Sequence, residues 1–405
     1  MYRNTSIFLS GVLKLSIKKT VQKASKFLSL RLLLPACYNL NKHKKINDKK
    51  VVFIEKHADS MSDNFALINK ALEERGGYDI KLVCLRLGSA STLGFTKNSM
   101  KLAKEVADAK YVFYNDALTV YSCLPLKKET MTFQVWHACG AFKRFGADVA
   151  DSKFGNDEAE MKRYPHYANT DYVTVSSSEI EPIYEHAMLL SKDKGQRAIA
   201  TGISRTDAYF DKEKLASARQ RTEEKVPQAH GKKIWLYAPT FRGSTVFKAQ
   251  IPKALDIEKF CSAMPEDTVL LIKHHPFAHD KQQIPENCAD RVFDVTDSLA
   301  IDDLLMTADL CITDYSSLIF EYSLMDKPMV FFAYDIDEYL DERGFYYPFE
   351  EFCPGPIVKT TDELIEAVNG SFDMKKIAAF RDKFMSACDG HATERILALM
   401  DEGKN

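Results

Sequence analysis

The 405-residue chain has little net charge, and it lacks both paired cysteine motifs and long apolar runs. A formal charge of −2, which combines a basic first 50 residues with an acidic remainder, argues against a general nucleic-acid-binding protein. The nine cysteines form no CxxC spacing, which favours free thiols in a reducing compartment and no structural metal site. No segment approaches the roughly 20 apolar residues of a membrane-spanning helix. Arg31 and Pro35 argue against a cleaved export signal.

The first 50 residues are rich in lysine and arginine and contain a single acid, Asp48. Apolar residues recur there at helical spacing, and lysines occupy the other faces (Leu13, Ile17, Val21, Ala24 and Leu28; Lys14, Lys18, Lys19, Lys23 and Lys26). The pattern predicts that segment 1–49 holds a basic amphipathic helix on an anionic membrane surface. A helix packed on the protein's own core, or a disordered tail, is the alternative.

After residue 50 the pattern predicts a repetitive α/β chain. Short apolar runs alternate with helix-length segments, and such runs are typical of buried parallel strands. We expect two Rossmann-like domains, at 50–230 and 231–405, whose parallel sheets face a cleft. The charged segment 211–233 is interpreted as an exposed helix and a linker. The predicted strands are 51–55, 80–87, 111–114, 132–136, 172–176 and 198–200, then 234–237, 269–273, 291–295, 310–313 and 329–332.

Segment 310–332 carries the clearest local signal. An apolar run, a small polar turn, an amphipathic stretch and a second apolar run predict strand, turn, helix and strand. Ser316 and Ser317 fall where the helix would begin, and the free amides of a helix start bind phosphate well. The alternative is that a serine simply caps the helix.

Polar side chains gather where the predicted strands end. The segments are 136–146 and 201–207 in the first domain, and 238–242, 273–276 and 313–317 in the second. Ligands of open parallel sheets bind beside the carboxyl ends of the strands. We therefore expect these segments to share one site, and three histidines at this edge are hard to explain as core residues alone (His137, His274 and His275).

Six phrases, in this order over residues 133–358, resemble the CDP-glycerol glycerophosphotransferase family, whose members build the alditol-phosphate chains of teichoic acids and related capsules. They are WHACGAFKRFG, TGISRTD, YAPTFRG, KHHP, TDYSSLIFEYS with KPMVFF, and RGFYYPFEEFCPGPIV. The resemblance implies a GT-B architecture with an N-terminal acceptor domain and a C-terminal CDP-alditol-binding domain. It also implies peripheral attachment to the cytoplasmic side of the cell membrane. The chain departs from the family's usual pattern at 204–207, at Glu321 and at 138–139, and the departure at 138–139 leaves both the primase and the polymerase type open.

The expected reaction transfers glycerol phosphate from CDP-glycerol to a hydroxyl of a lipid-linked acceptor and releases CMP. A neutral histidine can accept the hydroxyl proton near pH 7, which suits His137 as general base. His275 is expected to stabilise the pyrophosphate or to protonate the departing CMP, and His274 is interpreted as structural. The expected substrate-binding residues are Lys143, Arg144, Arg205, Asp207, Thr240, Arg242, Asp314, Ser316, Ser317 and Glu321.

No cofactor or metal is expected in the site. The triplet from Asp335 to Asp337 matches a DxD metal motif, but this triplet is common by chance, and a magnesium ion accompanying the pyrophosphate is left open. Three other functions are also left open: a CDP-ribitol ribitolphosphotransferase, a nucleotide-sugar glycosyltransferase on the same scaffold, and a non-enzymatic protein of the membrane surface.

Overall fold

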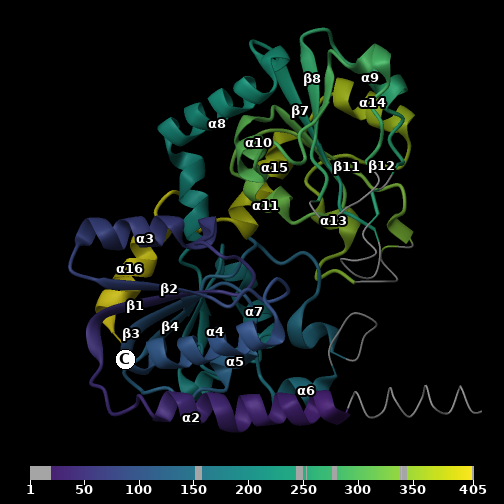
Figure 1. Ribbon diagram of the computed structural model, residues 1–405. Coiled ribbons are helices and arrows are strands. Elements are labelled where there is room, and N and C mark those ends of the chain that lie inside the picture. Colours follow the sequence, from purple (N-terminus) through teal and green to yellow (C-terminus); the bar gives the residue numbers. More distant parts are fainter. Residues whose placement is uncertain are drawn as a thin grey trace, which may run out of the picture.

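The computed structural model describes residues 20–150, 157–242, 250–251, 253–275, 281–337, 339 and 344–403. Two parallel six-stranded sheets form two α/β domains, stacked one above the other in Figure 1. Helices flank both sheets, as the alternation of strand and helix along the chain requires. The architecture confirms the predicted pair of Rossmann-like domains in a GT-B-like arrangement.

The sheet of the first domain has the strand order β2-β1-β3-β4-β5-β6, with every neighbouring pair parallel. Residues 51–54 at its centre are fully buried and apolar, which explains why the strand is recognisable in the sequence. The strand order reverses between β1 and β3, where ligands of such sheets bind. The strands are β1 (Asn47–Glu55), β2 (Asp79–Cys84), β3 (Ala109–Tyr114), β4 (Met131–Gln134), β5 (Tyr172–Thr174) and β6 (Arg197–Ile199).

The sheet of the second domain has the order β12-β11-β10-β7-β8-β9 and reverses between β7 and β10. All eleven strands expected from the sequence are present. The twelfth, β12, was missed because two residues are too few to show a pattern. The strands are β7 (Lys233–Ala238), β8 (Thr268–Ile272), β9 (Val292–Asp294), β10 (Leu310–Thr313), β11 (Met329–Phe332) and β12 (Ile357–Val358).

The charged segment between the two sheets is the helix α8, as its sequence indicates. The carboxylate of Asp211 accepts hydrogen bonds from the amides of Glu213 and Lys214, which fixes its first turn. The α-helices of the described residues include α2 (Leu34–Asn39), α3 (Asp63–Arg75), α4 (Thr92–Glu105), α5 (Thr119–Ser122), α6 (Glu158–Arg163), α7 (Glu181–Ala187), α8 (Lys212–Lys225), α9 (Ile257–Ala263), α10 (Ile301–Thr307), α11 (Leu318–Ser323), α13 (Phe349–Phe352), α14 (Thr361–Asn369), α15 (Met374–Phe384) and α16 (Ala392–Glu402).

The N-terminal segment is partly integrated into the first domain. Residues 20–28 are helical and continue through a π-helical turn, Ser29–Leu33, into α2 along the base of this domain (Figure 1). Leu34 and Tyr38 are fully buried in its core, and β1 already begins at Asn47, before the predicted boundary at residue 50. The opposite face exposes apolar side chains (Val21, Phe27, Leu28, Leu32 and Leu33). Leu13 and Ile17 of the expected amphipathic helix lie outside the described residues.

The C-terminal helix α16 lies on the first domain, not on the second domain to which the sequence assigned it. Ile396, Leu397 and Met400 share a core cluster with Val51 and Phe53 of β1. Figure 1 shows α16, in yellow, beside α3. The chain therefore crosses between the domains a second time. Among the described residues, no helix combines the length and the apolar character needed to cross a membrane.

Candidate active site

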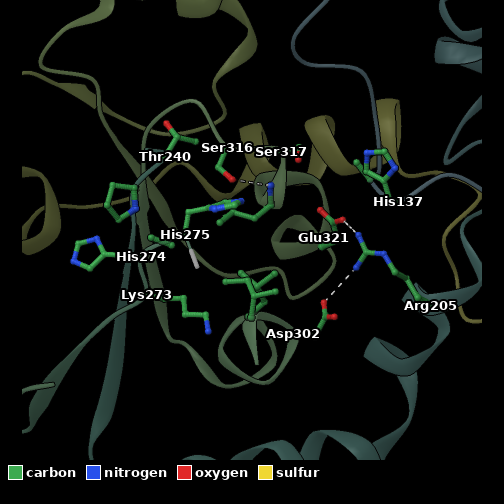
Figure 2. A pocket seen from close by; sticks show the side chains of 16 residues that line it. His137, Arg205, Thr240, Lys273, His274, His275, Asp302, Ser316, Ser317 and Glu321 are labelled. Atoms are coloured by element: carbon green, nitrogen blue, oxygen red, sulfur yellow. Dashed lines mark hydrogen bonds and ion pairs between the residues drawn. The ribbon is translucent and has the colours of Figure 1, made fainter. Parts of the chain in front are cut away.

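A pocket of about 530 Å³ lies between the two domains. His137, which follows β4, and Arg205, from the 3-10 helix Ser204–Phe210, come from the first domain. Figure 2 shows these two at one side of the pocket and the strand ends of the second domain at the other. The second domain contributes the residues after β7, β8 and β10, with parts of α10 and α11: Ala238, Pro239, Thr240, Lys273, His274, His275, Ile301, Asp302, Leu305, Ser316, Ser317, Leu318 and Glu321.

His137 is held in one tautomer by a backbone carbonyl. Its Nδ1 lies 2.9 Å from the carbonyl oxygen of Asn115, which follows β3. A carbonyl oxygen can only accept a hydrogen bond, so Nδ1 carries the ring proton. Nε2 of the neutral ring then keeps its lone pair. The indole of Trp136 stacks on the imidazole with 4.3 Å between the ring centres, which further restricts the ring.

Both histidines after β8 line the pocket. Burial lowers the pKa of His275 below the usual histidine value, and the positive charge of Lys143 lowers it further. Burial also lowers the pKa of His274, and its Nδ1 has no hydrogen-bond partner within the described residues. His274 is only 3% exposed, as expected of a structural residue, yet it borders the pocket.

Ser316 and Ser317 lie together at the start of α11. Ser317 occupies the capping position, but within the described part of the chain its side chain makes no capping hydrogen bond. The hydroxyl of Ser316 accepts a long hydrogen bond, 3.4 Å, from the amide of Leu318. The simple capping interpretation therefore does not account for Ser317. Ser316 and Ser317 both line the pocket, as the expected role in binding phosphate requires.

Arg205 connects the two domains through ion pairs. Its guanidinium donates to the carboxylate of Glu321 on α11 and, at 3.3 Å, to that of Asp302 on α10 (Figure 2). Burial opposes the charge, but the carboxylate of Glu321 raises the pKa of Arg205 well above its usual value. Asp302 is not recognisable as a site residue in the sequence, because an acid in the first turn of a helix is ordinarily interpreted as complementing the helix dipole.

Three residues expected to bind substrate have other partners. The fork of Arg242 binds Asp335 at 2.5 and 2.8 Å, and a further nitrogen donates to Asp314 at 3.0 Å. Asp314 also accepts from the amide and the hydroxyl of Thr240, so it orients the turn after β7. Neither Arg242 nor Asp314 is among the described lining residues of the pocket, because each charge is already matched within the second domain.

Asp207 is the third. Its carboxylate accepts hydrogen bonds from the backbone amides of Ala392 and Thr393, at 3.0 and 2.8 Å. It therefore caps the start of α16 and does not line the pocket. The acids of the DxD triplet are also paired, Asp335 with Arg242 and Asp337 with Lys359. The described residues contain no group of three His, Cys, Asp or Glu side chains placed to hold a metal ion.

Lys143 and Arg144 lie in a smaller adjoining pocket of about 180 Å³. Its aromatic lining residues are Trp136, Phe142, Phe145 and Tyr184, and Ala138 and Ser317 line both pockets. Arg144 donates from Nε to the carbonyl of Phe345 at 3.2 Å. The Lys143 ammonium lies 5.2 Å from the ring centre of Tyr339. Lys143 and Arg144 therefore lie beside the main pocket and add positive charge next to it.

The chain is similar to known proteins in both sequence and fold. A family model described as CDP-glycerol:poly(glycerophosphate) glycerophosphotransferase matches residues 36–401. The teichoic acid ribitol-phosphate primase of Bacillus spizizenii is 33% identical over 356 residues, 87% of this chain and 90% of that protein. The teichoic acid glycerol-phosphate primase of Bacillus subtilis is 30% identical over 344 residues, 81% of this chain and 86% of that protein.

A solved structure shares the fold. The wall teichoic acid polymerase TagF, in a variant of one histidine, superposes with a TM-score of 0.71 at 22% identity, over 95% of this chain and 97% of that chain. The family model spans nearly the whole described chain and includes every phrase on which the resemblance rested. The chain therefore belongs to the CDP-glycerol:poly(glycerophosphate) glycerophosphotransferase family.

Proposed function

We propose that the protein transfers an alditol phosphate from a CDP-alditol to a hydroxyl of a lipid-linked acceptor in teichoic acid synthesis, with release of CMP. The observation that supports this most directly is the composition of the pocket. One domain supplies to the pocket a histidine whose Nε2 keeps its lone pair. The other domain supplies a helix start and two histidines to the same pocket. Membership of the family supports the class of reaction.

In this mechanism His137 is the general base. Its Nε2 takes the proton of the acceptor hydroxyl while the oxygen attacks the phosphorus that bears the alditol, and the bond from that phosphorus to the CMP oxygen breaks. General-base catalysis of this kind contributes about 10² to 10⁴ in rate. Alignment of the attacking oxygen with the leaving group and stabilisation of the phosphoryl oxygens supply the rest.

The second domain would hold the diphosphate. Ser316 and Ser317, with the first amides of α11, offer hydrogen-bond donors to phosphate oxygens. His275 is largely neutral before the donor binds, because its pKa is lowered. A diphosphate beside it favours the imidazolium. Once protonated, His275 would donate to the CMP phosphate as it departs.

Glycerol and ribitol remain two candidate alditols. The motif resemblance led us to expect CDP-glycerol. The relative from Bacillus spizizenii named for ribitol phosphate is 33% identical over 87% of this chain, which favours CDP-ribitol as the second candidate. Both donors carry the same CDP group, so the strand ends of the second domain would bind either in the same way.

The acceptor proposal includes a peripheral position on the cytoplasmic face of the membrane. Phe27, Leu28 and Leu32 expose apolar surface on the N-terminal helical segment, where Lys23 adds positive charge. Such a surface binds anionic lipid through apolar burial and charge attraction together. It would hold the pocket near a lipid-linked acceptor.

The proposal is tested by measuring CMP release from CDP-glycerol and from CDP-ribitol, each with a detergent-solubilised lipid-linked disaccharide that carries one or no glycerol-phosphate unit. We expect acceptor-dependent CMP release with at least one donor, and the preferred acceptor separates priming from polymerising. His137→Ala should lose the activity, whereas His230→Ala, at an exposed histidine that pairs with Glu223 and does not line the pocket, should retain it. No CMP with any combination, from folded protein, would refute the proposal and turn attention to nucleotide sugars.

A further inference from the structure

A buried amide side chain links the two backbone segments that meet at His137. Gln134 is the last residue of β4 and is fully buried. Its Oε1 accepts a hydrogen bond from the amide of Trp136 at 2.8 Å, and its Nε2 donates to the carbonyl of Asp116 at 3.1 Å. Gln134 thus ties the residue directly before His137 to the residue directly after Asn115, whose carbonyl accepts from Nδ1 of His137.

The turn that Gln134 holds is strained. Trp136 has a φ of 54°, in the left-handed region that a bulky side chain rarely adopts. Such a conformation is unfavourable and persists only where the surroundings enforce it. The hydrogen bond from the Trp136 amide to Gln134 is one such constraint, and the left-handed turn brings the imidazole of His137 back against the end of β3.

Asn115, whose carbonyl accepts the hydrogen bond from His137, is itself held by side-chain hydrogen bonds. Its Nδ2 donates to Oε2 of Glu55 and to the hydroxyl of Ser62, both at 3.2 Å. The other carboxylate oxygen of Glu55 accepts from the amide of Ser62 at 2.8 Å. Glu55 ends β1 and is 3% exposed. The hydrogen-bond network of Gln134, Asn115 and Glu55 therefore spans the ends of β1, β3 and β4, at the point where the strand order reverses.

We propose that Gln134, supported by Asn115 and Glu55, is a positioning residue that keeps His137 in the tautomer with the proton on Nδ1 and the lone pair on Nε2. A general base must present an unprotonated nitrogen to its substrate, and the group that orients a base governs its efficiency without touching the substrate. The role in catalysis rests on the proposed function. The tautomer itself does not, because it is a property of the protein alone.

The test combines a spectroscopic and a kinetic measurement. Selective ¹⁵N-histidine labelling of the full chain, with His137 assigned by its absence from His137→Gln, reports which ring nitrogen carries the proton. We expect the Nδ1–H tautomer in the unmodified protein and a mixture of tautomers in Gln134→Met. The same variant should lose about 10- to 100-fold in kcat, the loss typical of partners that orient metal-bound histidines, with the KM of the donor within about twofold.

Gln196→Met is the matched control. Gln196 is also a buried glutamine and donates from Nε2 to the carbonyls of Tyr167, Ala168 and Thr170, none of which belongs to the two segments that meet at His137. Its loss should lower stability to a similar extent and leave both the tautomer and kcat per folded molecule unchanged. Equal effects of the two substitutions on kcat would reduce Gln134 to a purely structural role and overturn the proposal.

A second variant, Gln134→Glu, covers the case in which Gln134→Met does not fold. Burial keeps the introduced carboxyl protonated near neutral pH, so it can still accept from Trp136 and donate to Asp116. As it ionises at higher pH, we expect the tautomer to change and kcat to fall along an additional alkaline limb, beyond the one that deprotonation of His275 gives the unmodified protein. Absence of the additional limb, or an Nε2–H tautomer in the unmodified protein, would overturn the proposal. If the protein transfers no alditol phosphate at all, the tautomer measurement still decides the positioning role.

Discussion

The guanidinium of Arg205 in the first domain donates a hydrogen bond to the carboxylate of Glu321 in the second, across the pocket that both line. Both side chains are largely buried, with 13% and 4% of their surface exposed. Neither charge is well solvated, so each depends on the other. The pair therefore couples the relative placement of the two domains to the charge balance of the site.

Glu321→Ala should lower the free energy of unfolding by about 3 kcal/mol, because it leaves a buried guanidinium with Asp302 as its remaining acid. Urea unfolding followed by tryptophan fluorescence measures the change. Glu74→Ala is the control, since the Lys70–Glu74 pair is exposed on both sides and should contribute less than about 0.5 kcal/mol. Similar losses in the two variants would contradict a buried interdomain contact.

Gly140→Ala should reduce both stability and activity. The new Cβ would lie 2.2 Å from the ring of Phe320 on α11, and Gly140 has a φ of 62°. Gly195→Ala measures the cost of the positive φ alone, because φ is 75° there and no described atom lies within 4 Å of the new Cβ. We expect a loss of about 1 kcal/mol for Gly195→Ala and about 1 to 3 kcal/mol more for Gly140→Ala, with reduced kcat in the latter alone. Thermal unfolding measures the loss of stability, and CMP release measures kcat.

Asp207→Ala should behave as the loss of a helix cap. Removing the carboxylate frees the amides of Ala392 and Thr393 and should lower stability by about 1 to 2 kcal/mol. Asp207→Asn keeps one acceptor oxygen and should lose less. The KM of the donor should stay within about twofold in both. Unchanged stability with a raised donor KM would return Asp207 to the substrate-binding set in which its sequence motif placed it.

The pKa of His275 should depend on Lys143. Burial is the larger cause of its lowered pKa and Lys143 the second, so Lys143→Met should raise the pKa part of the way towards 6.5. A lowered pKa favours the neutral ring, and a bound diphosphate should reverse that preference. Proton NMR titration, with the signal assigned by His275→Gln, measures the pKa with and without CDP. A pKa that does not move with either change would argue against contact between His275 and the diphosphate.

The double substitution Leu28→Asp and Leu32→Asp should weaken binding to anionic liposomes. Each leucine is 55% exposed, and burying such a side chain contributes on the order of 1 kcal/mol. A loss of about tenfold or more in sedimentation assays is therefore expected. Met374→Asp, at an exposed apolar residue that begins α15 in the second domain, should bind as the unmodified protein does. Unchanged binding by the double variant would remove the membrane role from this segment.

Much of the site could be predicted because its residues lie next to the strand ends that position them. Ser316 and Ser317 follow an apolar run, and so does His275, so a local pattern is enough to bring them to one edge of a sheet. Arg242 is different. Its nearest acid, Asp335, is 93 residues away in the sequence, and nothing local shows whether an arginine faces a ligand or an internal acid.

The same reason explains the residues that were misplaced or missed. Asp207 caps a helix that begins 185 residues later, and the sequence assigned that helix to the other domain. Asp302 lines the pocket and forms an ion pair with Arg205 across the domain boundary. The strained turn at Trp136 was expected to be strand, because a bulky residue in a left-handed conformation is held there by tertiary contacts and not by its own preference.

The sequence by itself determined the two parallel sheets, the order of the strands along the chain and the family. Buried strands need continuous apolar runs, and the family's phrases are contiguous in the chain. The tertiary structure alone decided which charges face the pocket, which tautomer His137 adopts and where α16 packs. These depend on distances between residues far apart in sequence. A charged or polar group takes the partner that folding brings near it, because burying it unpaired would cost too much free energy.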